Sequence, residues 1–485
     1  MRLTSAYTPE VGESFLWHDY ETFGADPRRD RPAQFAGVRT DMALVPIGDP
    51  ISIYCRPPRD VLPAPEACLI TRITPQHAER EGLREHEFAA RVHEALAEPG
   101  TCGAGFNSIR FDDEFTRNLL YRNFHDPYAR EWQNGNSRWD LIDLMRLCYA
   151  LRPQGIAWPE REICVPSFKL GDLTSNNGIA HANAHDALSD VEATLALARL
   201  VRERQPRLFE FYLGLRNKRR AMTLLDWAAQ APVLHASSRY PARRGCLAMI
   251  VPLAPHPEQN NAVIVYDLDV DPAPLIELPL DEIRDRLFTP RADLPEGVER
   301  IALKTVHANR CPALAPLSVL AGVDLARIGL DTERCNRNLE ILRAAPGVAA
   351  KIAQLFASER AQRPAEDADL ALYSGGFLDD GDRNTGKDVR CTPPGSLAAI
   401  EPRFRDARCR ELLFRYRARN FPESLSVDEH ERWREHRRAR LLRDSGLGLS
   451  LDQFRTRIAA NRAEGADVAI LDSLAAWGDE LTADL

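Results

Sequence analysis

The chain has 485 residues, of which 44% are hydrophobic and 28% charged, and its formal net charge at pH 7 is −8. At roughly 150 residues per domain, this length predicts about three globular domains, each large enough for its own core. No apolar run approaches the roughly 20 residues that span a membrane, and no basic segment followed by an apolar one opens the chain, so we expect a cytoplasmic protein without a membrane span or secretory signal.

The first 204 residues have the pattern of an α/β domain. Strands are predicted over residues 15–22, 35–39, 51–54 and 102–106, and helices over 85–97, 112–123, 139–150 and 186–204, where apolar residues recur at helical spacing. Gln205-Pro206 then marks a helix break and a domain boundary.

The rest of the chain changes character twice. A basic helical stretch over residues 208–229 leads into residues 232–320, whose strand-like runs at 246–251 and 262–266 predict a small β-barrel or sandwich. From residue 321 the pattern is helical, residues 364–382 form a polar connector with glycines, and the remainder is helical and rich in arginine. Ten scattered cysteines without a C-x-x-C pair disfavour structural zinc and indicate buried, reduced thiols.

The basic residues are unevenly distributed. Residues 205–250 carry eight Arg or Lys against two acids, and residues 403–443 carry thirteen arginines against seven acids. The net charge of −8 argues against a polyanionic partner, but the distribution of charge matters more than its sum. Each stretch is consistent with solvated helix faces or with a surface for nucleic acid.

Asp19 and Glu21 form the first of three acidic patterns. Residues i and i+2 of a strand point to the same face, so both carboxylates project together. Such a pair repels itself unless a cation lies nearby, although D-x-E is also common on surface strands. The neighbours Phe15, Trp17 and Phe23 predict that this strand is buried.

Asp112, His185 and Asp190 complete the set. Asp112 follows a predicted strand and opens a helix, where it also fits an ordinary N-cap. His185 precedes the next helix and Asp190 lies early on it, so both also fit a capping region and a polar face. The functional alternative makes Asp190 a metal ligand and His185 the base that removes a proton from water, because imidazole, with a pKa of about 6.5, is largely neutral at pH 7.

Four carboxylates favour Mg²⁺ or Mn²⁺ over zinc. Two such ions about 4 Å apart would hold an attacking water and stabilise the leaving 3′-oxygen of a terminal phosphodiester. The three patterns together therefore predict hydrolysis that releases nucleoside 5′-monophosphates from a chain end.

The D-x-E, N-x-x-x-F-D and H-x-x-x-x-D patterns resemble the DEDD exonuclease superfamily, histidine subclass. Longer words resemble bacterial exonuclease I, a family of single-strand-specific 3′→5′ deoxyribonucleases. These words are residues 18–24 (HDYETFG), 30–35 (DRPAQF), 110–114 (RFDDE), 136–140 (NSRWD), 149–153 (YALRP), 306–307 (VH), 311–312 (CP) and 416–422 (YRARNFP). The resemblance covers essentially the whole chain.

The resemblance implies an α/β, ribonuclease H-like exonuclease domain with a mixed sheet (1–204), an SH3-like β-barrel domain with a leading basic helix (205–360) and an α-helical C-terminal domain (361–485). It implies two Mg²⁺ ions, replaceable by Mn²⁺, held by Asp19, Glu21, Asp112 and Asp190, with His185 as general base. It further implies a monomer that degrades single-stranded DNA in repair and recombination and binds the acidic tail of single-stranded DNA-binding protein. Arg152 fits that tail site, and equally fits a generic surface arginine.

The resemblance also implies substrate contacts in a basic groove, where aromatic rings stack on bases at ~1–3 kcal/mol each. The residues in matching segments are Glu21, Arg117, Tyr128, Trp132, Arg146 and Lys169. Trp132 fits a core position equally well. Lys169 stands where the family pattern has an arginine, which keeps the charge but loses the bidentate fork for phosphate.

Two other functions stay open from the sequence. A ribonuclease or proofreading exonuclease of the same superfamily has the same acidic patterns, but about 280 residues follow the first domain here. A non-catalytic single-strand-binding or adaptor protein on a dead nuclease domain is disfavoured because all five catalytic side chains are present.

Overall fold

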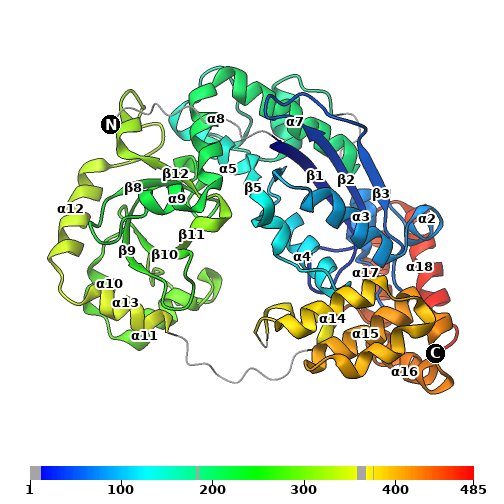
Figure 1. Ribbon diagram of the computed structural model, residues 1–485. Coiled ribbons are helices and arrows are strands. Elements are labelled where there is room, and N and C mark those ends of the chain that lie inside the picture. The colour runs from blue at the N-terminus through cyan, green and yellow to red at the C-terminus, as the bar shows by residue number, and fades with distance from the viewer. Residues whose placement is uncertain (1–11, 182–184, 358–366, 375) are drawn as a thin grey trace. The chain divides into compact units, whose positions relative to one another are not determined.

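The computed structural model describes residues 12–181, 185–357, 367–374 and 376–485 (Figure 1). The chain divides into two compact units, each built from segments that are distant in sequence. Among the described residues, unit 1 takes 138–180 and 194–357, and unit 2 takes 12–137, 181, 185–193, 367–374 and 376–485. The boundary predicted at 360/361 lies outside the described residues.

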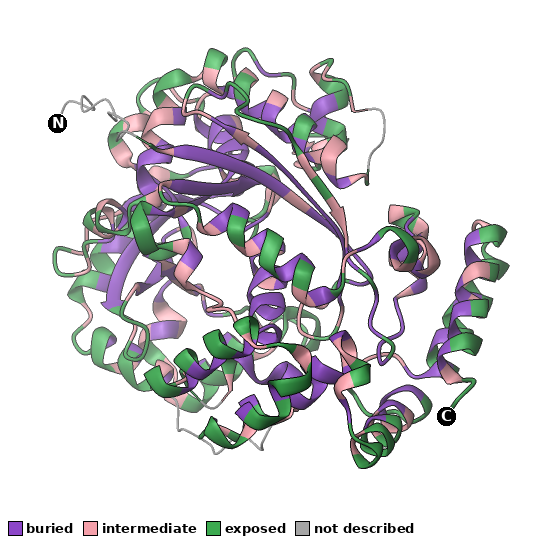
Figure 2. Ribbon diagram, turned by 45° about the vertical axis from the view of Figure 1, so that its right-hand side comes forward, coloured by how far each residue is buried: buried purple, intermediate pink, exposed green. Residues whose placement is uncertain are grey.

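Unit 2 contains a mixed sheet. Four of the five strands of this sheet lie in unit 2, and they are β1 (Ser14–Thr22), β2 (Pro32–Thr40), β3 (Ile51–Tyr54) and β4 (Thr101–Gly105), in the order β3-β2-β1-β4. β1 pairs antiparallel with β2 and parallel with β4, and β2 pairs antiparallel with β3. β1, β2 and β4 are almost entirely buried (Figure 2), so the predicted strands are confirmed with small shifts at their ends.

One face of this sheet is covered by helices α3 (Glu85–Ala97) and α4 (Asp112–Arg122). Leu16 and Tyr20 of β1 belong to the same buried cluster as Phe88 of α3 and Leu119 of α4. Because strand side chains alternate in direction, Asp19 cannot share that apolar face with Tyr20. Two short helices that the sequence did not predict, α1 (Pro65–Thr71) and α2 (Pro75–Glu81), follow β3.

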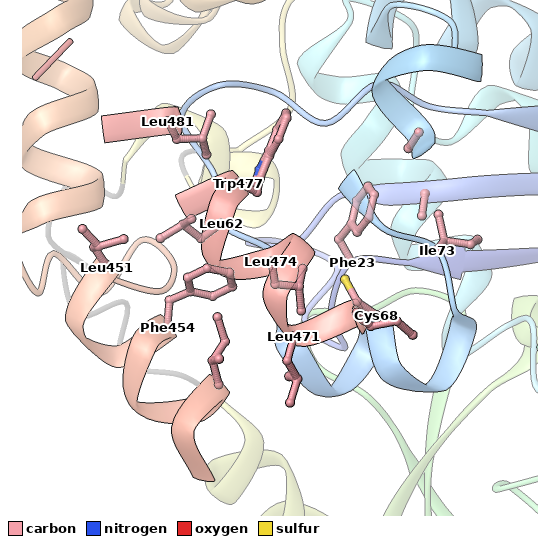
Figure 3. Close-up of a cluster of buried hydrophobic side chains, with 14 of the residues drawn as sticks. Phe23, Leu62, Cys68, Ile73, Leu451, Phe454, Leu471, Leu474, Trp477 and Leu481 are labelled. Atoms are coloured by element: carbon pink, nitrogen blue, oxygen red, sulfur yellow. The ribbon is translucent and has the colours of Figure 1, made fainter. Parts of the chain in front are cut away.

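The C-terminal part of unit 2 is helical, as predicted. It comprises α14 (Asp380–Cys391), α15 (Ala407–Asn420), α16 (Val427–Leu442), α17 (Leu451–Ala463) and α18 (Val468–Thr482). A 3-10 helix η8 (Ala368–Tyr373) lies where only a connector was expected, and that prediction is wrong over its length. Figure 3 shows Phe454, Leu471 and Trp477 of the last two helices packed near Phe23 and Cys68, so the two ends of the sequence share one core.

Unit 1 contains an antiparallel sheet in the order β11-β10-β9-β8-β12. The strands are β8 (Val233–Ala236), β9 (Leu247–Pro255), β10 (Ala262–Asp267), β11 (Leu303–His307) and β12 (Ala313–Pro316). Both predicted strands of this region are confirmed. No recorded pairing within the described residues joins β11 to β12, so closure into a barrel stays a prediction.

The helices of unit 1 differ from the prediction in three places. They are α5 (Leu141–Leu151), α6 (Leu170–Asn176), α8 (Pro206–Leu213), α9 (Lys218–Leu224), α10 (Ala273–Glu277), α11 (Leu280–Phe288), α12 (Thr332–Ala344) and α13 (Val348–Phe356), with the later part of α7 (Ala187–Arg204). The helix predicted from residue 139 begins at Leu141, because Asp140 ends strand β5 (Ser137–Asp140) and caps the helix by accepting from the Ile142 amide at 3.2 Å. The basic helical stretch is split between α8 and α9, and α10 and α11 interrupt the region expected to be β.

Two smaller features complete the description. A hairpin of β6 (Glu160–Glu162) and β7 (Val165–Pro166) precedes α6. All ten cysteines are free thiols, and eight of them are buried, as predicted for most of the thiols, while Cys164 and Cys391 are exposed. None of the helices in the described part of the chain is long and apolar enough to cross a membrane.

Candidate active site

Asp19 and Glu21 lie near the end of β1, on the strand that the sequence predicted to be buried. Phe15 and Trp17 are fully buried in the same strand, and Glu21 is only 7% exposed. Glu21 stands opposite Gln34 of β2 in the antiparallel register. The ladder shifts register directly after Glu21, so the two carboxylates sit where regular pairing ends.

Asp112 is the first residue of α4, and the helix N-cap is Phe111, so the N-cap alternative for Asp112 is wrong. Its side chain is 2% exposed. Instead of capping its own helix, its Oδ1 accepts a hydrogen bond from the main-chain N–H of Tyr20 at 3.0 Å. This bond holds the Asp112 carboxylate against β1 at Tyr20, the residue between Asp19 and Glu21.

His185 and Asp190 come from the start of α7. One ligand atom from each of Glu21, His185 and Asp190 lies within 4.8 Å of the other two. Asp190 is in the first turn of α7, and His185 is exposed and has a left-handed backbone, with φ of 67°. The structure therefore brings the first and third acidic patterns together, although about 165 residues separate them in the sequence.

Gln34 fastens the start of α7 to the sheet. Its side-chain amide donates to Oδ2 of Asp186 at 3.3 Å, and its Oε1 accepts from the Ala187 main-chain N–H at 3.3 Å. Asp186 also caps the helix by accepting from the Ser189 amide at 3.1 Å. The sequence did not predict this link. Gln34 belongs to the family-like word DRPAQF, but that word by itself assigns no function to its side chain.

The carboxylates destabilise one another's charges. Burial, together with the charges of Asp112, Glu21 and Asp190, holds the pKa of Asp19 well above its usual value. Burial, with the charges of Asp190 and Asp186, raises the pKa of Glu21 to about 8. A site with this excess of negative charge and oxygen donors fits a hard divalent cation, which would relieve the repulsion.

A second histidine, which the sequence did not single out for a role, also reaches this site. His181 Nε2 lies 2.5 Å from Oδ1 of Asp190.

On the other side of β1, His18 is buried, and burial lowers its pKa to about 4, so it is neutral. Asp113 and Arg130 form a buried ion pair at 2.6 Å within the same unit.

A cavity of about 790 Å³ opens beside Glu21. Its walls come from the end of β1, the following loop, α1, Phe111 and the segment around α17. The lining residues are Tyr20, Glu21, Thr22, Gly24, Ala25, Asp26, Arg29, Asp30, Ala64, Glu66, Ala67, Ile70, Thr71, Phe111, Asp444, Gly446, Gly448, Leu449, Gln453 and Arg457. Pockets of this size hold small organic ligands, and many of the wall positions here are Gly or Ala.

Three family models match successive parts of the chain: Exonuclease over residues 16–198, the Exonuclease I SH3-like domain over 216–358 and the Exonuclease I C-terminal domain over 366–481. Exodeoxyribonuclease I of Escherichia coli (strain K12) is 47% identical over 468 residues, which cover 96% of this chain and 98% of that protein. The chain belongs to the exonuclease I family. The predicted exonuclease domain, SH3-like domain and helical C-terminal domain are thereby confirmed.

Solved structures of the exonuclease I family agree with this fold. Exonuclease I from Methylocaldum szegediense is 53% identical with a TM-score of 0.92, and the match covers 97% of this chain and 99% of that one. The zinc-ion-bound form of the Escherichia coli exonuclease I–single-stranded DNA complex is 47% identical with a TM-score of 0.91, covering 97% and 99%.

The substrate contacts that the exonuclease I resemblance implies have different surroundings. Trp132 is 66% exposed, so the core alternative for its side chain is wrong. Arg117 is 4% exposed, and its guanidinium donates to both carboxylate oxygens of Glu131, at 2.7 and 2.9 Å. Arg117 also lies over the partly exposed ring of Tyr128, 5.5 Å from its centroid. The edge-to-face neighbour of Tyr128 is Phe377, which is 86% exposed and was not singled out from the sequence.

The remaining implied contacts of the exonuclease I pattern lie in unit 1. Lys169 is exposed and occupies the N-cap position of α6. Arg146 is buried, forms an ion pair with Asp143, and lies 5.7 Å from the ring centroid of Phe168. Arg152 donates to the main-chain oxygen of Val319 at 3.0 Å.

Part of the arginine-rich segment in the C-terminal helices is internal, although six of its thirteen arginines are exposed. Arg415, Arg417 and Arg440 are at most 5% exposed and form ion pairs with buried or partly buried acids. Asp369 alone contacts four guanidinium groups, and its side chain is fully buried. The buried arginines of residues 403–443 therefore stabilise the fold, while the exposed ones remain on the surface.

Proposed function

We propose that this exonuclease removes nucleotides from the 3′ end of single-stranded DNA and releases nucleoside 5′-monophosphates. The observation that carries the proposal is the convergence of Glu21, His185 and Asp190, with Asp19 and Asp112 alongside, in a partly buried site with excess negative charge. The relative from Escherichia coli solved with single-stranded DNA supports the choice of substrate.

Two Mg²⁺ ions are the proposed cofactors, and Mn²⁺ is expected to substitute. Asp19, Glu21, Asp112 and Asp190 offer hard oxygen donors, which these ions prefer. When bound, the ions activate a water molecule and stabilise the charge on the leaving 3′-oxygen. The raised pKa values of Asp19 and Glu21 are consistent with carboxylates arranged for a positive charge between them.

The side chains of the site have separate roles in the proposed reaction. His185, exposed at the rim, accepts the proton of the attacking water at a ring nitrogen and passes it to solvent. Asp112 is held in place by the Tyr20 amide, so it keeps its orientation during turnover. Glu21 borders both the acidic cluster and the cavity, which suits a ligand that also contacts the terminal nucleotide. We propose that the cavity receives that nucleotide.

The path of the strand is proposed from charge and aromatic exposure. In unit 2, Trp132, Tyr128 and Phe377 offer ring faces or edges for stacking on bases, and Arg117 lies against Tyr128. In unit 1, the proposed contacts are the exposed Lys169 and the ion-paired Arg146. We further propose a cytoplasmic monomer with domains 1–204, 205–360 and 361–485 that acts in DNA repair and recombination. Arg152 is the proposed contact for the acidic tail of single-stranded DNA-binding protein.

A time course with 3′-labelled and 3′-blocked oligonucleotides tests polarity and dependence on an end. We expect labelled mononucleotide to appear first from the 3′-labelled strand and hydrolysis to stop at the blocked end. Duplex DNA and RNA of the same sequence are expected to be degraded much more slowly. Degradation of RNA at the rate of DNA would refute the substrate class.

Asp19→Ala tests the metal role separately. We expect loss of Mg²⁺-dependent hydrolysis with nearly unchanged binding of single-stranded DNA in EDTA. His430→Ala, on the exposed side of α16, is the matched control and should hydrolyse normally. Unchanged hydrolysis by Asp19→Ala would contradict the role of this carboxylate.

A further inference from the structure

His181 makes a short contact to one carboxylate of the proposed metal site. Its Nε2 lies 2.5 Å from Oδ1 of Asp190, nine positions later in the sequence. The two side chains are 8% and 17% exposed, so solvent competes little with this bond. The contact joins the chain before residues 182–184, which lie outside the described residues, to the first turn of α7.

Asp190 is thus approached by two histidines from one chain segment, and they reach it differently. His185 lies with Asp190 and Glu21 in the group whose ligand atoms are within 4.8 Å of one another. His181 contacts Asp190 through its Nε2 and the carboxylate oxygen Oδ1. One carboxylate of the site is therefore bonded to an imidazole that the proposed reaction leaves without a role.

The bond restricts the side-chain rotation of Asp190. An aspartate in the first turn of a helix otherwise rotates about two side-chain torsions, and its oxygens exchange positions. An imidazole N–H that donates to one oxygen fixes the plane of the carboxylate. Hydrogen bonds of this kind to ligating groups orient them and typically change metal affinity or activity by about 10–100-fold when removed.

We infer that His181 is a positioning residue, which donates through Nε2 to Asp190 and orients that carboxylate for divalent cation binding. The inference rests on the proposed function of the site. It requires the tautomer that carries the proton on Nε2. A purely structural role, in which the bond only fastens the chain to α7, predicts a loss of folding stability instead of a specific loss of metal affinity.

Three substitutions of the full-length protein separate these roles. His181→Ala removes the donor, His181→Gln places an amide N–H near the position of Nε2, and His181→Asn places its amide closer to the backbone and out of reach. The probe is Mn²⁺, whose free concentration is measured by electron paramagnetic resonance without DNA. His430→Ala serves as the control histidine.

We expect His181→Ala and His181→Asn to weaken Mn²⁺ binding by about 10–100-fold and His181→Gln to restore most of it. The KM for single-stranded DNA should stay unchanged, and kcat should recover at high Mn²⁺ concentration. The unfolding temperature in EDTA should match the wild type. Wild-type Mn²⁺ affinity in His181→Ala, or no difference between the Gln and Asn variants, would overturn the inference.

Failure of the proposed function has a different signature. A wild-type protein that binds Mn²⁺ but does not hydrolyse single-stranded DNA would refute the activity, while the order of Mn²⁺ affinities among the variants would still test His181. If the kcat of His181→Ala stays below that of the wild type at saturating Mn²⁺, the positioning role of His181 is contradicted, because excess metal compensates for a poorly oriented ligand.

Discussion

The phenol oxygen of Tyr20 lies 3.0 Å from Oγ1 of Thr116 and joins β1 to α4 across 96 positions of sequence. Thr116 Oγ1 donates in turn to the main-chain oxygen of Asp112 at 2.9 Å. Because the threonine hydroxyl has a single proton, Tyr20 is the donor in the first bond. Tyr20, which lies between Asp19 and Glu21 on β1, therefore helps to hold Asp112 in place.

Tyr20→Phe should disturb this arrangement without emptying the core. The ring keeps its volume, and the lost hydrogen bond should cost about 0.5–1.5 kcal/mol in the free energy of unfolding. We expect a several-fold rise in the Mg²⁺ concentration that gives half-maximal activity, measured with single-stranded DNA. Thr116→Val, which removes the other partner, should give the same rise; an effect of only one of the two changes would contradict the link.

The raised pKa of Glu21 predicts how stability without metal depends on pH. Between its ordinary value of 4.5 and about 8, the folded protein retains a proton that the unfolded chain releases. The stabilisation linked to this group is therefore present at low pH and is lost as the pH rises through about 8. In EDTA, we expect the unfolding temperature to fall between about pH 6 and pH 9 by a greater amount in the wild type than in Glu21→Gln.

At high pH, Mg²⁺ should raise the unfolding temperature of the wild type more than that of Glu21→Gln. The ion stabilises the carboxylate cluster of the wild type and binds a weaker site in the variant. Calorimetry with and without Mg²⁺ checks both parts. Identical pH profiles for the two proteins in EDTA would show that Glu21 is not the titrating group.

Asp369 should be among the most sensitive positions for stability. Its carboxylate lies 2.5 Å from Arg419, 3.1 Å from Arg415 and 3.2 Å from Arg440, and these charges hold its pKa well below the usual value despite its burial. Asp369→Asn removes the counter-charge that these guanidinium groups share and leaves Asp60 and Asp367 among their remaining partners, so urea unfolding should show a loss of about 3–5 kcal/mol.

Asp380 provides the matched control for Asp369→Asn. It pairs with Arg383 at the surface and its side chain is 89% exposed, so Asp380→Asn should leave the urea unfolding midpoint nearly unchanged. Equal effects of the two substitutions would contradict a special role for the buried network.

The cavity beside Glu21 predicts tolerance of large terminal nucleotides. Ala67 lines it and Ala43 does not. We expect Ala67→Trp to slow removal of a 3′-terminal nucleotide that carries a bulky group on its base more strongly than removal of the unmodified one, because the new side chain fills part of the cavity. Ala43→Trp, at an exposed position, should leave the ratio of the two rates unchanged. An unchanged ratio in Ala67→Trp would place the terminal nucleotide elsewhere.

Lys169 tests the departure from the family pattern. Lys169→Ala should raise the KM for single-stranded DNA several-fold and reduce the salt dependence of binding by about one unit of slope, as expected for one lost phosphate contact. Lys169→Arg should bind at least as tightly as the wild type, since it restores the bidentate fork. No loss in Lys169→Ala would remove this residue from the DNA path.

The sequence by itself determined the local parts of this site. Asp19 and Glu21 share a strand because the period of a strand is two, and α3 begins and ends at the residues that apolar spacing indicated. The sequence did not predict the strand end at Asp140. This residue is the last of β5 and the N-cap of α5, which begins at the next residue. Local periodicity does not distinguish the last residue of a strand from the first turn of a helix.

Only the tertiary structure decided which distant groups meet. Asp112 bonds to the Tyr20 amide 92 positions away, and Gln34 reaches Asp186 across 152 positions. No period along the chain relates such pairs, because strand pairing and helix packing bring them together only when the core forms. The same holds for Arg415, Arg419 and Arg440: their shared partner Asp369 lies fully buried, where an unpaired charge is too costly to persist, and the composition of residues 403–443 does not reveal this partner.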